Sequence, residues 1–455
     1  MLLKEIGAYV ARERSSQLSD KTIHHAKRAV IDWFAATMPG TAQDPGPMLR
    51  AALAEEIGHG RAVVLPGGAS ALTRTAAFLN GTAAHTAEFD DIHRDSAVHP
   101  GCATIAAALA CAQTTGCDGE TFLRGVIAGF EVSTRIGLAM TREHYKFWHA
   151  TATISTFGAS AAAALILGLD EDETAHALAT AATMAAGLQQ AFRSDAMSKP
   201  IHAGHAAEAG VTSAMAAGKG VTGALDVLDG PVGMGAAMSG RADWSKATAG
   251  LGSAYNIEVM TFKNHGCCGH TFAAIDGALV LKQQHGIDAA DIDSIHVGTY
   301  RPSVDICNRP DPQTPVDCRF SLHYVVAHAL VHGSVRLAAF EPERMADPAV
   351  RDLLPKITLE LDEDIDSRFP GQRAARVTIA MRTGERFTFL QPTRKGDPDM
   401  PLSDAELSDK FTELAGSVLA DAEAEALLAA LWGLEKRSSL DLPGLQAKPA
   451  RASVA

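Results

Sequence analysis

The sequence predicts a mainly helical protein in which a large all-helical domain is interrupted by a smaller α+β domain. Apolar residues make up 47% of the 455 residues and aromatic residues only 5%, so Ala, Leu, Val and Ile must fill the core, which favours closely packed helices. Up to about residue 260, Ala, Leu and Gly recur at the three-to-four spacing of helices. After about residue 290, several stretches alternate with period two, as strands do.

The helices of the first part have recognisable starts. The stretch SDKTIHHAKRAVIDWFAATM offers Ser19 or Asp20 as an N-cap, and DEDETAHALATAATMAAGL offers Asp170, with acidic residues following each cap. Residues 150–169 are uncharged and long enough to span a bilayer, but they include five Ser or Thr and two Gly. We therefore expect a buried helix there and not a membrane span.

A small sheet is expected in the later part of the chain. The stretches SIHVGTY, KITLEL and ARVTIAMRTGERFTFL alternate in period two, the last interrupted by a turn at Thr383 and Gly384. The stretch FSLHYVVAHALVHG is a helix between them, and PLSDAELSDKFTELAG returns to helical periodicity with Ser403 or Asp404 as a cap. The expected domains are a discontinuous helical domain, 1–262 plus 396–455, and an α+β lid domain, 263–395.

Charge and cysteine usage exclude several classes of protein. A formal charge of −13 argues against nucleic acid or an anionic membrane surface as the partner, because both would repel the chain. The seven cysteines show no C-x-x-C spacing, so neither a disulfide framework nor an iron–sulfur pattern is indicated. The start MLLKEIGAYV carries Lys4 and Glu5 where a signal peptide needs an apolar run, so we expect a cytoplasmic location.

The stretch AAHTAEFDDIHRDSAVHPG gathers three histidines, one arginine and four carboxylates in an otherwise alanine-rich chain. If residues 81–92 are helical, His85 and Glu88 share one face with apolar neighbours, and Asp90 and Asp91 point elsewhere. Titratable groups that cluster beside apolar ones are typical of functional sites, but they also occur in structural networks. The stretch is therefore a candidate catalytic site, with a solvated helix end as the alternative.

Two further histidines lie where the chain changes conformation. His99 precedes Pro100, which keeps it outside a helix and lets it point into a cleft. Nearby acids, including Glu88 and Asp91, are expected to raise the pKa of His99 and make it a proton donor. His149 directly precedes the uncharged helix; a lone histidine there is more often a capping or core residue than a catalyst.

The stretch FRSDAMSKPIHAGHAAEAG is the second candidate site. Pro200 suits the first turn of a helix and leaves Lys199 at its N-terminus, where free N–H groups attract an anion. His202 and His205 follow one turn apart on the same helix. With Arg193 they form a cationic spot suited to a carboxylate substrate; the alternative is a lysine that only solvates the helix start.

The stretch FKNHGCCGHTFAAIDGAL lies at the expected domain junction. It holds His265, Cys267, Cys268 and His270 around two glycines. Zinc sites usually space their cysteines two residues apart, and these two are adjacent. No metal site is therefore predicted.

Taken together, these stretches resemble the MmgE/PrpD family. The segments NGTAAHTAEFDD, HPG, WHATAT, FGASAAAALILG, MSKPIHAGHAAEAG, FKNHGCCGHTFAAIDGAL, RFSLHYVVAHALVHG and GDPDMPLSDAELSDKF occur in that family's order and approximate spacing. The family includes 2-methylcitrate dehydratase, cis-aconitate decarboxylase and iminodisuccinate epimerase. The resemblance covers residues 1 to 430 and implies a helical domain built from both chain ends, an inserted lid, a homodimer, and a metal-free site between domains that needs no cofactor.

The residues and the resemblance together give the candidate site. The catalytic candidates are His99, His149, Lys199, Glu88, Asp90 and Asp91. The candidates for substrate binding are Lys199, His202, Arg193, His85, Cys268 and His270. The chain departs from the family pattern in three places. Glu88 replaces the usual Asp, and IHRDSAV makes the segment before His99 one residue longer than in the decarboxylase. The stretch KNHGCCGHTF has Phe272 where the family has a later His.

The expected function follows from what the three family activities share. Each moves charge at a carbon next to a carboxylate, which requires a positioned base and cationic groups facing the developing enediolate. We expect a cofactor-independent lyase, and specifically a hydro-lyase acting on a hydroxylated di- or tricarboxylate. An epimerase or a decarboxylase would use the same proton chemistry. A catalytically silent carboxylate-binding protein is the alternative outside enzymes, because Glu88 and the altered HGCCGH stretch would also fit lost activity.

Overall fold

The computed structural model describes residues 1–192 and 196–443, and it is mainly helical, as predicted. The chain divides into two compact units, one made of Met1–Phe262 and the chain from Ser403, the other of Lys263–Leu402. The second unit extends seven residues beyond the boundary expected after residue 395, from 395 to 402. The extra segment stays with this unit because the Asp397 carboxylate accepts hydrogen bonds from Arg394 (3.0 and 2.8 Å) and Met400 Sδ accepts one from Gln391 Nε2 (3.1 Å).

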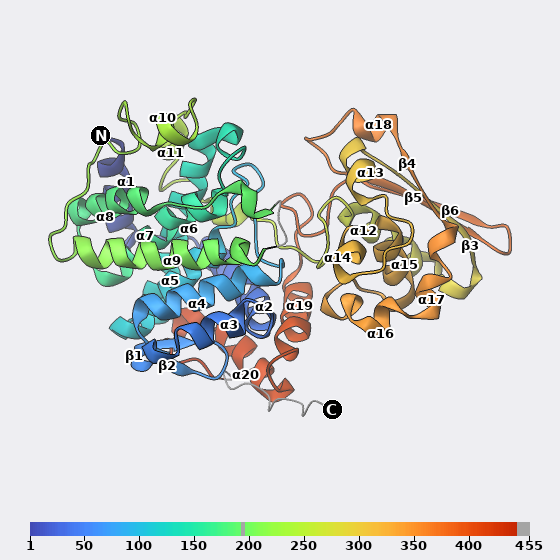
Figure 1. Ribbon diagram of the computed structural model, residues 1–455, viewed down its shortest axis with the longest axis horizontal. Helices are drawn as coiled ribbons and strands as arrows, with labels where there is room; N and C mark the ends of the chain where they lie inside the picture. Colours follow the sequence, from blue (N-terminus) through green and yellow to red (C-terminus); the bar gives the residue numbers. More distant parts are fainter. Residues whose placement is uncertain (193–195, 444–455) are drawn as a thin grey trace. The chain divides into compact units, whose positions relative to one another are not determined.

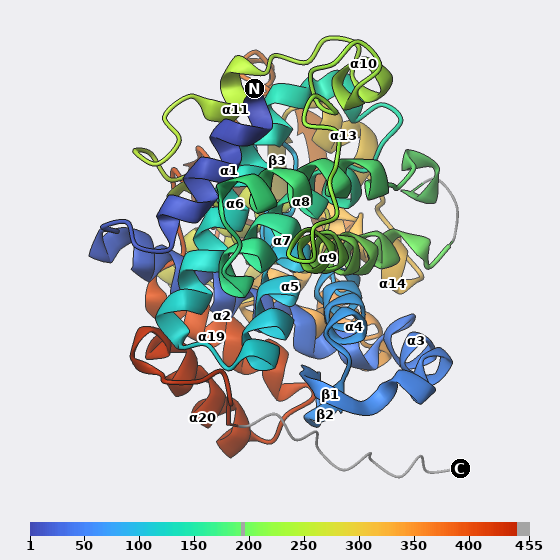
Figure 2. The ribbon, with the colours of Figure 1, turned by 90° about the vertical axis from the view of Figure 1, so that its left-hand side faces the viewer.

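The first unit is a bundle of helices with one short β-hairpin (Figures 1 and 2). Its helices are α1 (Leu2–Glu13), α2 (Asp20–Ala42), α3 (Gly46–Ala52), α4 (Thr73–Thr86), α5 (Pro100–Thr115), α6 (Gly119–His144), α7 (Ala150–Leu167), α8 (Glu171–Met184), α9 (Ser198–Ala217), α10 (Met234–Met238), α11 (Ser245–Thr248), α19 (Asp404–Gly416) and α20 (Asp421–Trp432). The antiparallel hairpin is β1 (Ile57–Val64) and β2 (Ala69–Ala71), which the sequence analysis missed.

Helix α7 lies in the middle of the first unit and packs against α5, α6, α8 and α9 (Figure 2). It is long and apolar enough to cross a membrane, but 94% of it is buried inside the protein. The prediction of a buried helix is confirmed, since its surroundings are other helices of the same unit.

Small residues let these helices approach closely. A Cβ added at Gly129 of α6 would lie 2.5 Å from the Gly158 carbonyl oxygen of α7. A Cβ at Gly204 of α9 would lie 2.1 Å from Thr82 Oγ1 of α4. Such distances leave no room for a side chain, so glycine is what permits the close approach of α7 and α9 to their neighbours.

The predicted helix starts are confirmed in their details. The Ser19 and Asp170 side chains accept hydrogen bonds from the backbone N–H three residues later (3.1 and 2.8 Å), as N-caps do. Ser403 caps α19 in the same way, and its own backbone N–H donates to the Glu406 carboxylate, which completes a capping box.

The second unit is a four-stranded sheet with helices packed on it (Figure 1). The strands β3 (Ile292–Thr299), β4 (Ile357–Leu361), β5 (Ala375–Met381) and β6 (Arg386–Gln391) form the order β4-β3-β5-β6. β3 runs parallel to β4 and antiparallel to β5, and β5 pairs antiparallel with β6. The helices are α12 (Phe272–His285), α13 (Arg301–Cys307), α14 (Pro315–Arg319), α15 (Leu322–His332), α16 (Pro342–Met345), α17 (Pro348–Arg351) and α18 (Glu363–Asp366).

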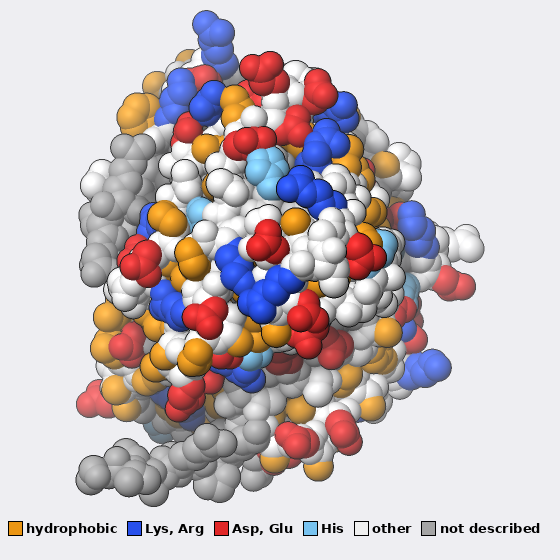
Figure 3. Space-filling model, turned by 90° about the vertical axis from the view of Figure 1, so that its right-hand side faces the viewer, with side chains coloured by type: hydrophobic (Ala, Val, Ile, Leu, Met, Phe, Trp, Pro, Cys, Tyr) orange, Lys and Arg blue, Asp and Glu red, His pale blue; other side chains and the backbone are white. Residues whose placement is uncertain are grey.

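The core of this unit confirms the period-two interpretation. Buried side chains of α12 and α15 pack on alternate residues of β3 and β5, including Ile295, Val297, Val377 and Ile379. The face seen in Figure 3 carries Lys and Arg side chains with Asp and Glu side chains among them.

Candidate active site

The loop after α4 differs from the sequence prediction. Helix α4 ends at Thr86, and Glu88 has a φ of 62°, so the helix expected over residues 81–92 does not continue. A non-glycine residue in this left-handed region is uncommon and is stable only where surrounding groups hold it. The prediction was wrong because side chains and carbonyl groups of this loop have partners on other helices, which no local pattern reveals.

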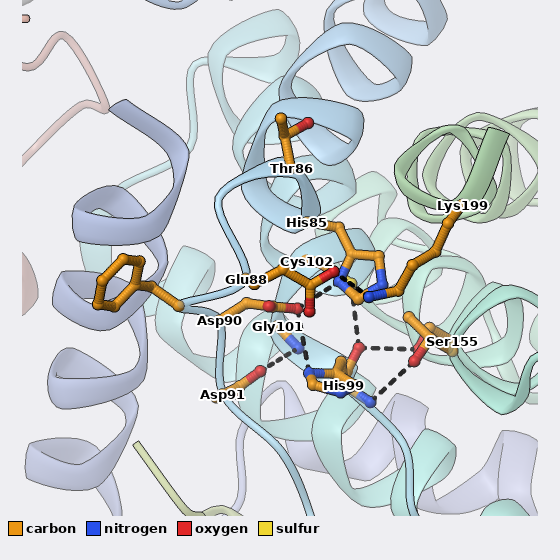
Figure 4. A network of polar contacts seen from close by, with 12 residues as sticks. His85, Thr86, Glu88, Asp90, Asp91, His99, Gly101, Cys102, Ser155 and Lys199 are labelled. Carbon is orange, nitrogen blue, oxygen red and sulfur yellow. Dashed lines mark hydrogen bonds and ion pairs between the residues drawn. The ribbon is translucent and has the colours of Figure 1, made fainter. Parts of the chain in front are cut away.

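Asp90 lies between two histidines, contrary to the expectation that it points away (Figure 4). Its Oδ2 lies 2.6 Å from His85 Nδ1 and 3.1 Å from His99 Nδ1. Asp90 and His85 are each 1% exposed. A buried carboxylate in contact with two imidazoles restricts the orientation of both rings.

His99 is held by the start of α7 as well as by its place before Pro100. It is the N-cap residue of α5, outside the helix, as predicted. Its N–H donates to Thr151 Oγ1 (3.2 Å), and its carbonyl accepts from Ser155 Oγ (3.1 Å). Hydroxyl groups in the first turns of the uncharged helix therefore hold the backbone of His99, and Figure 4 shows the contact with Ser155.

Asp91 faces the start of α5 and not the two histidines. Its Oδ1 accepts a hydrogen bond from the Gly101 N–H (3.1 Å), and its side chain is 3% exposed. Burial raises the pKa of this carboxyl well above its usual value, and the nearby Asp32 and Asp90 raise it further. Asp90, and not Asp91, is therefore the carboxylate beside His99.

Four imidazoles follow one another at short distances. The ring of His85 lies 5.1 Å from that of His99 and 5.4 Å from that of His149, and the His149 and His202 rings are 5.3 Å apart. His149 Nδ1 and His202 Nδ1 are 3.0 Å apart, a hydrogen-bond distance that requires one of them to lack a proton.

Burial keeps two of these imidazoles neutral. It lowers the pKa of His149 well below its usual value, and the neighbouring His85 and Lys199 lower it further. The pKa of His202 is lowered by burial and then by His85 and His205. A neutral imidazole near pH 7 is able to accept a proton, which a protonated one is not.

Lys199 supplies a cation beside these rings. Helix α9 begins at Ser198, so Lys199 lies in its first turn, and its ammonium is paired with the Glu88 carboxylate (Figure 4). Burial lowers the pKa of Lys199, but Glu88 and Asp90 outweigh it, and the net pKa is raised. The lysine therefore remains positively charged in a partly buried position.

A cavity of about 610 Å³ borders this cluster. His202 and Ile201 of α9, Phe78 of α4 and the segment 186–191 are among the groups that line it. Arg193, which the sequence analysis assigned to the same cationic spot, lies outside the described residues.

The His85, Asp90 and His99 atoms lie within 4.8 Å of one another and could in principle hold a metal ion. The 2.6 Å separation between His85 Nδ1 and Asp90 Oδ2 is a hydrogen-bond distance. Two atoms bound to one tetrahedral zinc lie about 3.3 Å apart, given Zn–N and Zn–O bonds near 2.0 Å. In this structure His85 and Asp90 are hydrogen-bonded to each other, and His99 Nδ1 lies 3.1 Å from the same carboxylate.

The candidates of the second unit each have a different partner. His265 Nε2 lies 2.9 Å from Asp276 Oδ1, and its ring meets the edge of Phe272. His270 Nδ1 lies 3.0 Å from the Tyr300 hydroxyl. Within residues 1–192 and 196–443, the four His and Cys residues of the HGCCGH stretch do not form a group of three metal ligands.

The Cys268 thiol is set apart from the other cysteines by its acidity. A hydrogen bond from Cys307 lowers the pKa of Cys268 to about 7, although burial raises it. The adjacent Cys267 bonds Thr271 instead (3.2 Å), and burial raises its pKa. The two neighbouring cysteines therefore differ in chemistry.

Lys410 and Asp32, which form a buried ion pair next to the loop, were not among the residues predicted for the site. Both side chains are 0% exposed and form an ion pair of 2.6 Å between α19 and α2. A signal was present, because Lys410 shares the i, i+3, i+4 and i+7 face of Leu407, Phe411 and Leu414. A lysine on the apolar face of a helix needs a buried partner.

The fold and the site define a two-unit, mainly helical protein with a buried acid–base cluster beside a lysine. The chain matches the MmgE/PrpD N-terminal domain over residues 4–247 and the MmgE/PrpD C-terminal domain over residues 265–435. It belongs to the MmgE/PrpD family, as the resemblance predicted.

Three curated relatives are similar over most of their length. The chain is 27% identical to the cis-aconitate decarboxylase-like protein oryM of Aspergillus oryzae over 442 residues, 91% of this chain and 90% of that protein. It is 27% identical to cis-aconitate decarboxylase of Homo sapiens over 461 residues, covering 96% and 93% of the two chains. For cis-aconitate decarboxylase of Mus musculus the identity is 28% over 375 residues, covering 79% and 75%.

Proposed function

We propose that the protein is a cofactor-independent lyase acting on a small polycarboxylate at the cluster of His99, His149 and Lys199. The observation that carries this proposal is a charged lysine next to a neutral imidazole and to a second imidazole held by a buried carboxylate. Lys199 binds a substrate carboxylate, which replaces Glu88 as the partner of the ammonium. His149 accepts a proton, and His99, held by Asp90, donates one.

The first activity that we propose is decarboxylation of cis-aconitate or a closely related unsaturated tricarboxylate. Relatives that match almost the whole chain bear the name of this reaction, which supports it. The bond between carbon and the departing carboxylate breaks, CO₂ leaves, and the electron pair of this bond forms a new double bond to the neighbouring carbon. The pair of the original double bond moves to its far carbon, next to a remaining carboxylate. The carbon that becomes negative takes a proton from His99, while Lys199 stabilises the charge on the remaining carboxylates.

The second activity is dehydration of a hydroxylated di- or tricarboxylate, and a different observation favours it. Loss of water needs one group to remove the proton next to the carboxylate and another to protonate the departing hydroxyl. The site offers two separate carriers, because His149 is neutral and His99 is paired with Asp90. Glu88 and Phe272, where the chain departs from the family pattern, are reasons to test more than one acid.

Proton NMR in deuterated water distinguishes these activities. The purified protein is incubated with cis-aconitate, citrate, isocitrate and 2-methylcitrate. Release of CO₂ with a new unsaturated dicarboxylate identifies the decarboxylase, and a new double bond without CO₂ identifies the dehydratase. Exchange of the α-proton alone identifies an epimerase. Binding without any of these changes would overturn the proposal in favour of a silent binding protein.

We further propose that the protein is a cytoplasmic homodimer, as the family resemblance implies. Size-exclusion chromatography with light scattering should give twice the chain mass of 47.7 kDa. A mass of one chain at all concentrations used in the assay would overturn the dimer.

A further inference from the structure

Lys410 is a fully buried ammonium that touches the loop of the candidate active site. It lies on α19 and is 0% exposed. Its Nζ donates to Asp32 Oδ1 of α2 (2.6 Å) and to the carbonyl oxygen of Phe89 (3.0 Å). The same Nζ lies 5.7 Å from the centre of the Phe89 ring. One side chain thus joins two helices of the unit to a loop far away in sequence.

The carbonyl that accepts the hydrogen bond from Lys410 belongs to Phe89, which stands between Glu88 and Asp90 in the sequence. Phe89 is preceded by Glu88, which pairs with Lys199, and followed by Asp90, which lies against His85 and His99. A displacement of this carbonyl would move both carboxylates together. Lys410 donates directly to the Phe89 carbonyl, so a change at Lys410 acts on the loop segment that carries both carboxylates.

The loop needs such an anchor because its backbone is strained. Glu88 has a φ of 62°, and the left-handed conformation is unfavourable for a residue with a side chain. A charge-assisted hydrogen bond in a dry environment is strong enough to offset this cost. The other end of the loop is fixed separately, where Ile92 and Thr261 exchange two backbone hydrogen bonds of 3.0 Å.

A purely structural ion pair is the competing explanation. Buried ion pairs contribute little net stability, because desolvation of both charges offsets their attraction. Removing one partner alone is strongly destabilising, whereas removing both is often tolerated. If Lys410 served only to neutralise Asp32, a variant lacking both charges would retain an intact site.

We propose that Lys410 is a positioning residue, which fixes the Phe89 carbonyl and thereby holds Glu88 against Lys199 and Asp90 against the two histidines. The effect on rate rests on the proposed lyase function, but the effect on the geometry of the loop does not. Lys410 of α19 thus helps to orient the acid–base groups.

The test uses the double variant Asp32→Asn/Lys410→Met, which leaves no buried charge uncompensated. Its matched control is Arg28→Met/Asp404→Asn, which removes another ion pair between α2 and α19, at a different place along the two helices. For each protein, melting temperature, kcat, KM and the rate at which diethyl pyrocarbonate modifies His85 are measured. The rate of His85 modification, followed by peptide mass spectrometry, requires no activity.

We expect the Asp32/Lys410 double variant to fold and to lose about tenfold or more in kcat, because small misplacements of catalytic groups have large effects on rate. Its His85 should be modified at least about fivefold faster than in wild type, because a displaced loop exposes this imidazole. The Arg28/Asp404 variant should match wild type in kcat and His85 modification. Normal kcat and normal modification of His85 in the folded Asp32/Lys410 variant would overturn the proposal. If wild type shows no lyase activity, the proposed function fails, and His85 modification still decides the role of Lys410.

Discussion

The Lys199 ammonium lies near the neutral imidazole of His149 and pairs with the half-exposed carboxylate of Glu88. This position is the reason for assigning substrate binding to Lys199. The Glu88 side chain that now pairs with Lys199 is 45% exposed, so a substrate carboxylate can take its place. Lys199→Met removes the charge but keeps most of the side-chain volume. We expect kcat/KM to fall about a hundredfold or more, because a charge-assisted hydrogen bond in a closed site contributes on that scale.

The control for this prediction is Lys219→Met, an exposed lysine just after the end of the same helix. It should leave kcat/KM within about twofold of wild type, because exposed charges contribute little. Steady-state kinetics of both variants, together with their melting temperatures, decide the question. A change below about threefold in Lys199→Met at unchanged stability would remove Lys199 from substrate binding.

We assign the donation of a proton to His99. Gln has a similar reach and polarity but transfers no proton, so His99→Gln should fold, bind ligand and lose about a hundredfold or more in kcat. The control His176→Gln changes another half-buried histidine, whose Nδ1 lies 3.2 Å from the Gly223 carbonyl oxygen. It should lower the melting temperature slightly and leave kcat near wild type. Near-normal kcat in folded His99→Gln would exclude His99 from the mechanism.

Which residues gather at the site could be predicted from the sequence, but not how they pair. His85, Asp90 and His99 are close in the chain, and their chemistry marked the stretch. Their pairing depends on the left-handed turn at Glu88, for which the sequence carries no glycine or other turn signal. The partnership of Lys199 with Glu88 joins residues 111 positions apart, and only the packing of α9 on α4 reveals it.

Among the helices and strands, the sequence predicted those features that depend on neighbouring residues alone, such as helix caps. Caps such as Ser19 and Ser403 form hydrogen bonds within their own helix, so the sequence is sufficient to locate them. The hairpin of β1 and β2 was missed because Gly58 and Gly60 interrupt the alternation of β1, and β2 has only three residues. Its pairing depends on tertiary packing that period-two patterns cannot register when strands are this short.

Helix packing through glycine gives a prediction at this scale. At Gly204 an added Cβ would lie 2.1 Å from Thr82 Oγ1 and 2.4 Å from the Phe78 carbonyl of α4. We expect Gly204→Ala to destabilise the first unit by about 1–3 kcal/mol, the usual cost of overpacking a core. The measurement is chemical denaturation followed by helical circular dichroism.

Gly416→Ala is the matched control, because the same methyl group added at the end of α19 meets no atom within 4 Å. It should leave stability unchanged or raise it by up to about 1 kcal/mol, since Ala favours the helix over Gly. Equal effects of the two substitutions would show that close approach of α4 and α9 is not what requires Gly204.

For the whole molecule, buried histidines predict how stability depends on pH. Burial lowers the pKa of His93, His144, His270 and His328 to about 4. Their usual pKa in the unfolded chain is about 6.5. A group whose folded pKa is lower contributes its stability above about pH 6.5 and loses it as the pH falls toward about 4. At about pH 5 the loss is on the order of 1–2 kcal/mol for each histidine.

Glu131 opposes this trend, because burial raises its pKa from 4.5 to about 7. Its contribution to folding stability is fully present below pH 4.5 and is lost as the pH rises through about 7. Asp91 acts in the same direction as Glu131, whereas His149 and His202 act with the four histidines, so the histidines outnumber these carboxyls and the melting temperature should fall between about pH 6.5 and about pH 4.5. Two of the four histidines lie in each unit, so calorimetry should show the fall for both units. In His144→Gln/His328→Gln the acid dependence should be weaker; an unchanged slope would contradict the assignment.

The anchoring of the Phe89 carbonyl by Lys410 also sets an order of events during synthesis. The two residues are 321 positions apart, and ribosomes add about 5–20 residues per second, so the ammonium follows the loop by roughly 15–65 s. During that interval the nascent chain already contains His85, Asp90 and His99, but the lysine that fixes the carbonyl beneath them has not yet been made. A polypeptide still being translated therefore holds these side chains before α19, which carries Lys410, is available to pack against α2.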